Sequence, residues 1–440
     1  INTGNGLWTF DPNLRVPYVQ QWSFGLEREI GRGWVIEARY VGNHAIKIYR
    51  AVNFNEVNVF ENGFLSEFNN AKKNLDINLA NGKGNTFINN GLAGQVALPI
   101  FSSLFAGLAA GSGFGNSTFV NNLNLGNVGA TANTLAFSTT YKANRANLAP
   151  NFFVANPNAA FARLLTNASF SNYNSAQIEL RRRMSHGLYL QAGYTFAKNI
   201  TDSEGSQSTL EDYRTLRNIR IDRHRAGFDQ THRFIGNFIY ELPFGTGRRW
   251  LNSGFAPLRK IAEGWQIGGI INWQSGQPVS IYSSRSTLNA ANAGLNPANL
   301  VGITFDQLRD NMGVYKTPQG VFFINPSLLN ITTDPVTGKL INAPLKDGLL
   351  AAPAAGTFGN MPRNNINGPG FAQVDMNVVK RVFFTERRYF ELKVNFLNAF
   401  NHPNFAFTSA IFDDPNFTRI SGLRGNNTYR NINFILTISF

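Results

Sequence analysis

The histidines are the first candidates for catalysis or metal binding, and the chain has five: His44, His186, His224, His232 and His402. None stands in the H-E-x-x-H pattern or in another zinc-type spacing. The chain has no cysteine, so it offers neither a thiolate metal site nor a disulfide framework. The segment GSGFGN at 111–116 does not match G-x-G-x-x-G and lacks the strand and helix that this motif requires. We therefore expect no metal site and no cofactor.

The pair Asp229 and His232, in the segment DQTHRF, could belong to a Ser-His-Asp set. No serine stands out as its nucleophile, and the chain has no G-x-S-x-G elbow. We interpret the two residues as a hydrogen-bonded pair at the rim, where a strand starts. The sequence thus predicts no catalytic residue, and it favours a protein that is not an enzyme.

The formal net charge of +14 raises the question of nucleic acid. The basic residues are scattered, and no zinc-finger, helix-turn-helix or RNP motif accompanies them. The densest cluster is RTLRNIRIDRHR at 214–225. A solvated loop that faces anionic lipid head groups or ligands explains this cluster as well, so we expect no nucleic-acid partner.

No run of ~18 or more apolar residues is present, which excludes a transmembrane helix in this sequence. The most apolar stretch, Ala97–Gly111, is interrupted by Pro99, Ser102 and Ser103. We expect it to pack as a short helix within a loop.

Period-2 alternation, which gives a strand two unlike faces, recurs along the chain. In VQQWSFGLER, the residues Trp22, Phe24 and Leu26 share one face, and a short glycine turn leads to the alternating segment WVIEARYVG. Three further hairpins follow the same pattern at about 175–198, 232–276 and 372–400. The segment RNINFILTISF at 430–440 adds a ninth strand.

These strands are too long for most soluble sheets. They run roughly nine to thirteen residues, whereas strands of soluble proteins have a mode of ~5–6. A tilted strand needs ~9–11 residues to cross a bilayer. The sequence therefore predicts an all-β fold, an antiparallel transmembrane β-barrel with lipid outside and a wet lumen inside.

The alternation also assigns side chains to the two faces. We expect lipid or the interfacial girdle to surround Trp22, Tyr194, Phe238 and Phe396. We expect charged residues to face the lumen and a plug within it: Glu37, Arg39, Glu179, Arg181, Asp375, Glu391 and Lys393.

The connections alternate in length. Turns inside the hairpins are mostly short, whereas the hairpins are joined by long loops at about 43–172, 199–230, 277–370 and 402–429. This pattern predicts long extracellular loops, short periplasmic turns and a periplasmic C-terminus. The first loop is expected to hold small strands or helices of its own. Residues 416–423 could form a tenth strand, but we assign them to the last loop.

Several segments resemble the barrel of TonB-dependent receptors: YNSAQIELRRRMSHGLYLQAGYTFAKNITDS, DQTHRFIGNFIYELPFGTGRRW, GWQIGGIINWQSGQPVS and FELKVNFLNAFNHPNF. The group that looks most similar is Oar-like, and its members carry an N-terminal carboxypeptidase-regulatory-like domain. The resemblance implies a barrel of about 22 strands. It also implies a plug domain and a TonB box, neither of which is visible here. Residues 1–440 would be the C-terminal, roughly nine-stranded part of the barrel. The odd strand count agrees with this, because complete bacterial single-chain barrels have an even number of strands.

The same resemblance implies the function. The family binds scarce, large solutes outside the cell and imports them with energy relayed by TonB. The expected partners are outer-membrane lipid and, through the missing N-terminal part, the TonB complex. A passive channel or an adhesion and scaffold barrel remains the alternative, because lumen charges of both signs suit a pore equally well.

The last strand also resembles the signal that the barrel-assembly machinery recognises in outer-membrane proteins. Its alternating residues end on an aromatic side chain: Phe434, Leu436, Ile438 and Phe440. The expected location is the outer membrane.

Overall fold

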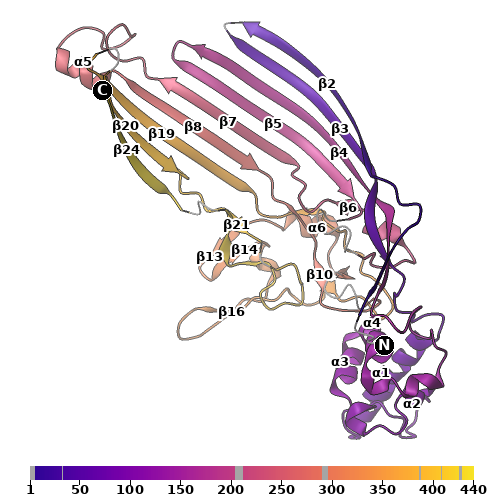
Figure 1. The fold of residues 1–440 in the computed structure, drawn as a ribbon. Coiled ribbons are helices and arrows are strands. Elements are labelled where there is room, and N and C mark those ends of the chain that lie inside the picture. Colours follow the sequence, from indigo (N-terminus) through magenta and orange to yellow (C-terminus); the bar gives the residue numbers. More distant parts are fainter. Residues whose placement is uncertain are drawn as a thin grey trace.

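The computed structural model describes residues 5–31, 33–203, 212–289, 296–385, 388–407, 409–425 and 429–440. Its main element is a curved antiparallel sheet whose long strands follow one another in chain order (Figure 1). They are β2 Tyr18–Gly31, β3 Trp34–Asn53, β4 Ala162–Ser185, β5 Leu188–Thr201, β7 His232–Glu241, β8 Trp265–Gln274, β19 Phe371–Phe383, β20 Tyr389–Leu397 and β24 Asn431–Ser439. The four hairpins expected from the sequence are all present.

The sheet is an open wall. Its edge strands are β2, which pairs with β3, and β24, which pairs with β20. Every residue of β2 is exposed, because no strand covers its outer edge. The described strands therefore form an open wall and do not close into the expected cylinder. Two short strands, β1 Leu7–Phe10 and β6 His224–Arg225, join the same sheet by pairing with β4 and β5.

Strands β3 and β4 are longer than a bilayer crossing requires. They contain 20 and 24 residues, against the ~9–11 that a tilted strand needs. Their pairing continues with bulges between Ala45 and Ile48 and between Ile48 and Arg50. The first long loop therefore begins after Asn53, later than the expected position near residue 43. The pairing thus continues beyond the segment whose residues alternate between apolar and polar.

The two ends of the wall differ in their connections (Figure 1). The connections between β2 and β3, β4 and β5, and β19 and β20 are short. The remaining connection at this end, between β7 and β8, contains the helix α5 Ala256–Ala262. The C-terminus lies at this turn end, whereas the long loops gather at the opposite, loop end.

The first long loop folds into a small helical subdomain. Its helices are α1 Phe64–Ala80, α2 Pro99–Leu104, α3 Ser117–Leu125 and α4 Val128–Phe137, with 3-10 turns at Ala110–Ser112, Thr139–Tyr141 and Asn144–Asn147. The short helix expected within 97–111 is thus confirmed as α2. Among the described residues, no helix has the length and apolar character needed to cross a bilayer.

Aromatic packing and helix capping explain why this subdomain is ordered. Phe64, Phe87 and Phe105 pack around Phe101, with ring centroids 5.1–5.5 Å from its ring. The carboxylate of Glu67 on α1 accepts hydrogen bonds from the first backbone N–H groups of α2, at Ile100 and Phe101. Burial nevertheless raises the pKa of Glu67.

The second long loop contains α6 Phe305–Asp310 and a set of two- and three-residue strands. These are β9 Pro278–Val279, β10 Tyr282–Ser283, β11 Asn296–Pro297, β12 Asn299–Leu300, β13 Tyr315–Thr317, β14 Gly320–Phe322, β15 Thr332–Thr333, β16 Leu340–Asn342, β17 Leu350–Ala351 and β18 Ile366–Asn367. The last loop adds β21 Phe405–Ala406, β22 Arg419–Ile420 and β23 Gly422–Leu423.

The segment 416–423 belongs to the last loop, as predicted. Strand β22 pairs with β14 and β23 pairs with β21, so neither joins the main sheet. Phe417 is completely buried in a core shared by the two loops, together with Phe322 and Ile324. The loops at this end are therefore packed structures with cores of their own.

Candidate functional site

The register places the seven charged residues predicted to face a lumen on one side of the sheet, here called the polar face. Residues directly opposite each other in an antiparallel pair point to the same side. Glu37 lies opposite Glu179, and Arg181 lies opposite Gln191. The register continues through Asn237 and Ile270 to Asp375. On β20, Lys393 and Glu391 lie opposite Val379 and Arg381 of β19, on the same side as Asp375.

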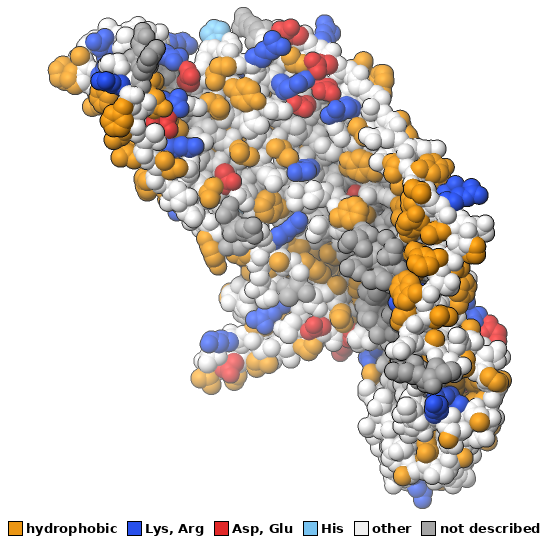
Figure 2. All heavy atoms as spheres, in the orientation of Figure 1, with side chains coloured by type: hydrophobic (Ala, Val, Ile, Leu, Met, Phe, Trp, Pro, Cys, Tyr) orange, Lys and Arg blue, Asp and Glu red, His pale blue; other side chains and the backbone are white. Residues whose placement is uncertain are grey.

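Four of these residues form one ionic network across β2, β3 and β4. Arg181 lies 2.7 Å from a carboxylate oxygen of Glu27, 3.5 Å from one of Glu37 and 3.4 Å from one of Glu179. Arg39 approaches the other oxygen of Glu37 at 3.7 Å. The network is half-exposed, so each pair adds little stability by itself. In Figure 2, basic and acidic side chains gather at this turn end of the wall.

The other three residues lie on β19 and β20, apart from this network. Glu391 accepts a hydrogen bond from Arg381 at 2.5 Å. Asp375 accepts hydrogen bonds from the amide of Gln373 and from the backbone N–H of Asn398. Within the described part of the chain, Lys393 has no carboxylate partner. The seven residues thus form two groups on one surface and do not converge on one site.

The opposite side of the sheet, here called the apolar face, carries the aromatic residues. Trp22, Tyr194, Phe238 and Phe396 all lie on this side. Figure 2 shows hydrophobic side chains along the edge formed by β2, where Phe24 and Leu26 are each 66% exposed.

Aromatic and polar rings cluster on the apolar face towards the loop end. The hydroxyl of Tyr194 lies 2.7 Å from Nδ1 of His232. The ring of His232 also contacts those of Phe196 and Trp273, with centroids 5.2 and 6.5 Å apart. We call Tyr194, Phe196, His232 and Trp273 the aromatic band. Such amphipathic rings are typical of a membrane–water interface.

The predicted hydrogen-bonded pair of Asp229 and His232 is wrong. His232 bonds to Tyr194, whereas the carboxylate of Asp229 is buried and accepts hydrogen bonds from Arg225 and from the backbone N–H of Asn199. The two residues diverge because His232 begins β7 while Asp229 still belongs to the preceding loop. In the described residues, no group of three or more histidines and carboxylates is placed to hold a metal ion.

A buried ionic cluster at the loop end was missed by the sequence analysis. Arg50, fully buried at the end of β3, lies 3.4 Å from Asp202 and 3.8 Å from Asp222. Its guanidinium stacks on the ring of Tyr213 at 3.6 Å. Burial raises the pKa of Tyr213.

Asp222 connects this cluster to the second long loop. It accepts a hydrogen bond from Arg214 at 2.7 Å and lies 3.4 Å from Arg363. Asp222 and Arg214 fall within the basic segment 214–225, which the sequence analysis interpreted as a solvated loop; both are buried, whereas Arg220 and Arg223 are exposed. The sequence contains one indication of this buried cluster, which is the density of arginine and aspartate beside long loops. The cluster fixes the loop end of β3 and β5 to two separate loops.

The final strand presents its predicted signal residues to the apolar face. Phe434, Leu436 and Ile438 lie opposite Val394, Leu392 and Phe390 of β20. Phe440 follows the end of β24 and is 94% exposed.

A protein-family model described as an outer membrane beta barrel domain matches residues 1–433. The outer membrane transporter YddB from Escherichia coli is a similar solved structure, with 8% sequence identity and a TM-score of 0.39. Its alignment covers 99% of this chain and 34% of YddB. No curated protein sequence gives a significant match.

Two further solved structures are similar to the chain. The FrpB iron transporter from Neisseria meningitidis (F3-3 variant) has 9% identity and a TM-score of 0.31, over 99% of this chain and 32% of its own. FpvA from P. aeruginosa, solved with an iron-bound pyoverdine, has 9% identity and a TM-score of 0.31, over 97% of this chain and 28% of its own. The chain thus spans about a third of the length of these proteins.

The buried cluster yields the first prediction. Replacing Asp222 by Asn leaves Arg214 and Arg363 without their shared carboxylate, and breaking a buried ion pair typically costs ~3–5 kcal/mol. We expect faster hydrogen exchange and faster proteolysis at the loop end, measured on the full-length protein, with the strands of the wall unaffected.

Glu61→Gln is the matched control, because it breaks the exposed ion pair between Glu61 and Arg217. Equal protection of the loops in the two variants would show that the Asp222 cluster does not hold them.

Proposed function

The chain belongs to the outer membrane beta barrel domain family, and we propose that it forms part of the wall of a TonB-dependent receptor that imports a scarce, large solute. The observation that carries the proposal is the two-faced wall with folded loops at one end. A porin-like channel needs the same two faces, but it has no need of loops with their own hydrophobic cores. Such loops on a rigid scaffold are suited to binding.

The proposed orientation follows from the chemistry of the two faces. The apolar face contacts lipid and the polar face lines the lumen, because lipid cannot solvate the network around Arg181. The loop end lies outside the cell and the turn end, with the C-terminus, lies in the periplasm, as in outer-membrane barrels generally.

The open edges at β2 and β24 imply further strands in the membrane. Unpaired backbone groups in hydrocarbon each cost several kcal/mol, so a wall of this kind is stable in lipid only when closed. We propose that strands preceding this segment complete a barrel of about 22 strands around a plug. The polar face, with Arg39, Glu179, Arg181 and Glu391, then contacts the plug through partly hydrated ionic interactions.

We propose that the helical subdomain and the second long loop capture the solute. Both contain fully buried aromatic side chains, such as Phe101 and Phe322, and so present defined surfaces. The Arg50 cluster, through Asp222 and Arg363, ties the second long loop to the end of β3, beside the lumen through which the solute would pass. A proposed partner at the turn end is TonB, acting through the N-terminal part of the full-length protein.

Uptake measurements test this function. Cells with the full-length protein should accumulate the solute only with an intact TonB system, because a plugged barrel admits nothing large by diffusion. Replacing residues 54–161, or 277–370, by a short glycine-serine linker should abolish binding at the cell surface while the barrel still inserts.

Uptake that persists without TonB would favour a passive channel, and surface binding without uptake under all conditions would favour an adhesion barrel. Binding that survives loss of both loops would move the binding site into the lumen.

We further propose that the last strand is the signal for the barrel-assembly machinery. Deleting Phe440 from the full-length protein should lower the fraction folded in the outer membrane, measured by heat-modifiable mobility on a gel. Phe384→Ala is a suitable control, since Phe384 is a similarly exposed aromatic residue at the turn end, 71% exposed. An unchanged folded fraction after the deletion would contradict the assignment.

A further inference from the structure

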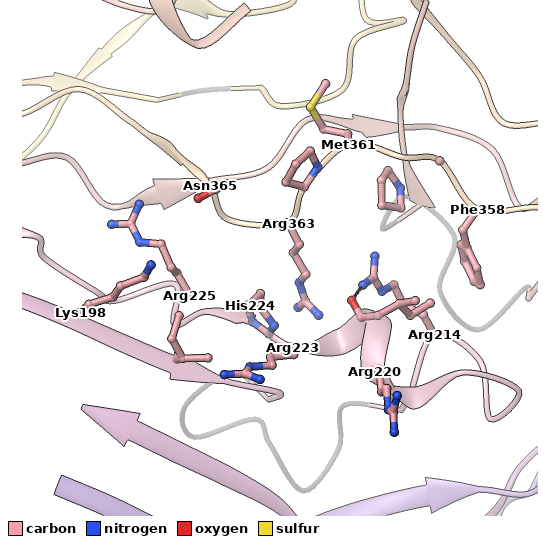
Figure 3. A pocket seen from close by; sticks show the side chains of 15 residues that line it. Lys198, Arg214, Arg220, Arg223, His224, Arg225, Phe358, Met361, Arg363 and Asn365 are labelled. Carbon is pink, nitrogen blue, oxygen red and sulfur yellow. Dashed lines mark hydrogen bonds between the residues drawn. The ribbon is translucent and has the colours of Figure 1, made fainter. Parts of the chain in front are cut away.

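A basic cavity lies beside the loop end of β5 (Figure 3). Its volume is about 370 Å³. Three parts of the chain line it: the end of β5, the following loop at Arg214 and from η5 Ile219–Asp222 through β6, and the second long loop at Pro297 and near 358–365. Its cationic side chains are Lys198, Arg214, Arg220, Arg223, Arg225 and Arg363.

Nearby carboxylates neutralise only part of this charge. Asp222 holds Arg214 and Arg363, and Asp229 holds Arg225. Lys198, Arg220 and Arg223 are exposed and have no carboxylate partner among the described residues. Three uncompensated cations around one cavity favour an anion with several acceptor oxygens, and a phosphate monoester has this character.

The register places the cavity just beyond the aromatic band. Lys198 and Ile200 lie on the same side of β5 as Tyr194 and Phe196. Arg225 lies opposite Ile200, so β6 continues this side. At ~3.3 Å per residue, Lys198 lies about 7 Å beyond Phe196 along the strand.

This distance matches the headgroup layer of a membrane. Aromatic side chains mark the boundary between hydrocarbon and headgroups, and the headgroup layer on each side is roughly 5–8 Å thick. In the proposed orientation the cations of the cavity therefore lie at the level of the outer-leaflet phosphates. Basic pockets at this depth are able to bind anionic lipid headgroups.

From these observations we propose that the cavity is a lipid site, which binds the phosphate monoester of an outer-leaflet lipid headgroup through Lys198, Arg220 and Arg223. The inference depends on the proposed function only for the orientation of the apolar face towards lipid. The bound headgroup would touch both β5 and the second long loop, and would thereby link the membrane surface to the proposed capture loop.

The proposal is tested by measuring which lipids the full-length protein retains. The protein is placed in nanodiscs of phosphatidylcholine with a small fraction of phosphatidic acid. Phosphatidic acid is the probe because its headgroup is a phosphate monoester. Native mass spectrometry after release into detergent counts the retained phosphatidic acid. The test variant combines K198Q, R220Q and R223Q. Since a basic residue near a charged surface contributes several-fold to lipid affinity, we expect retention to fall about 10-fold or more.

The matched control combines K83Q, K142Q and K339Q, which remove the same charge from exposed loop positions away from the cavity. The control should retain phosphatidic acid like the unaltered protein. Equal loss in both variants would reduce the effect to general electrostatic attraction and overturn the proposed site. Equal retention in all three proteins would overturn it as well.

A phosphate monoester could come from a lipid headgroup or from a soluble phosphate ester. Binding of soluble glycerol 3-phosphate distinguishes these two sources. If it binds the detergent-purified protein as tightly as phosphatidic acid does, and K198Q/R220Q/R223Q removes this binding, the cavity is a site for soluble phosphate esters and the lipid assignment is wrong. The readout needs neither TonB nor uptake. Failure of the transport hypothesis would therefore leave the lipid result unaffected. Failure of the lipid proposal would likewise leave the transport hypothesis unaffected.

Discussion

The structure depends on one constraint: each wall strand must satisfy its backbone hydrogen bonds with neighbouring strands while its side chains separate two solvents. Alternation supplies the separation, because successive residues point to opposite sides of a sheet. In this chain the register carries one face without interruption across the sheet, from Glu27 on β2 to Thr437 on β24. One continuous surface therefore carries the ionic network around Arg181 and the other carries the aromatic band.

The constraint ends where the bilayer would end, and the architecture changes there. Beyond Tyr40 the strands β3 and β4 stay paired, but their side chains lose the strict alternation and a buried arginine, Arg50, appears. Order at the loop end instead comes from aromatic packing within the helical subdomain and from the carboxylates of Asp202 and Asp222. The loop end is thus built like a soluble protein on top of a membrane-type wall.

This division gives the loop end two different surroundings. The helical subdomain and the second long loop lie beyond the sheet (Figure 1). The basic cavity, in contrast, lies directly beyond the aromatic band on the side proposed to face lipid. Asp222 belongs to both arrangements, since it pairs with Arg50 at the end of β3 and with Arg214 and Arg363 at the cavity.

Hairpins and faces could be predicted because their signal is local. The alternation of Trp22, Phe24 and Leu26 is visible in a few residues, and β2 follows from it. The Arg50 cluster could not be predicted, since Arg50 and Asp202 are 152 positions apart. Neither local sequence indicates which distant residue it will contact. The spacing of Asp229 and His232 suggested a pair, but the side chain of His232 instead contacts Tyr194 on the neighbouring strand.

The central claim is that one face of the wall contacts lipid and the other contacts water. Because the chain has no cysteine, single cysteines carrying a spin label can be placed at each position from 176 to 181 of β4 in the full-length protein in bilayers. The account predicts that lipid-soluble oxygen relaxes labels at even positions, including Ile178, and that an aqueous nickel reagent or contact with the plug affects labels at odd positions, including Glu179. Accessibility without a period of two, or with the two parities exchanged, would contradict it.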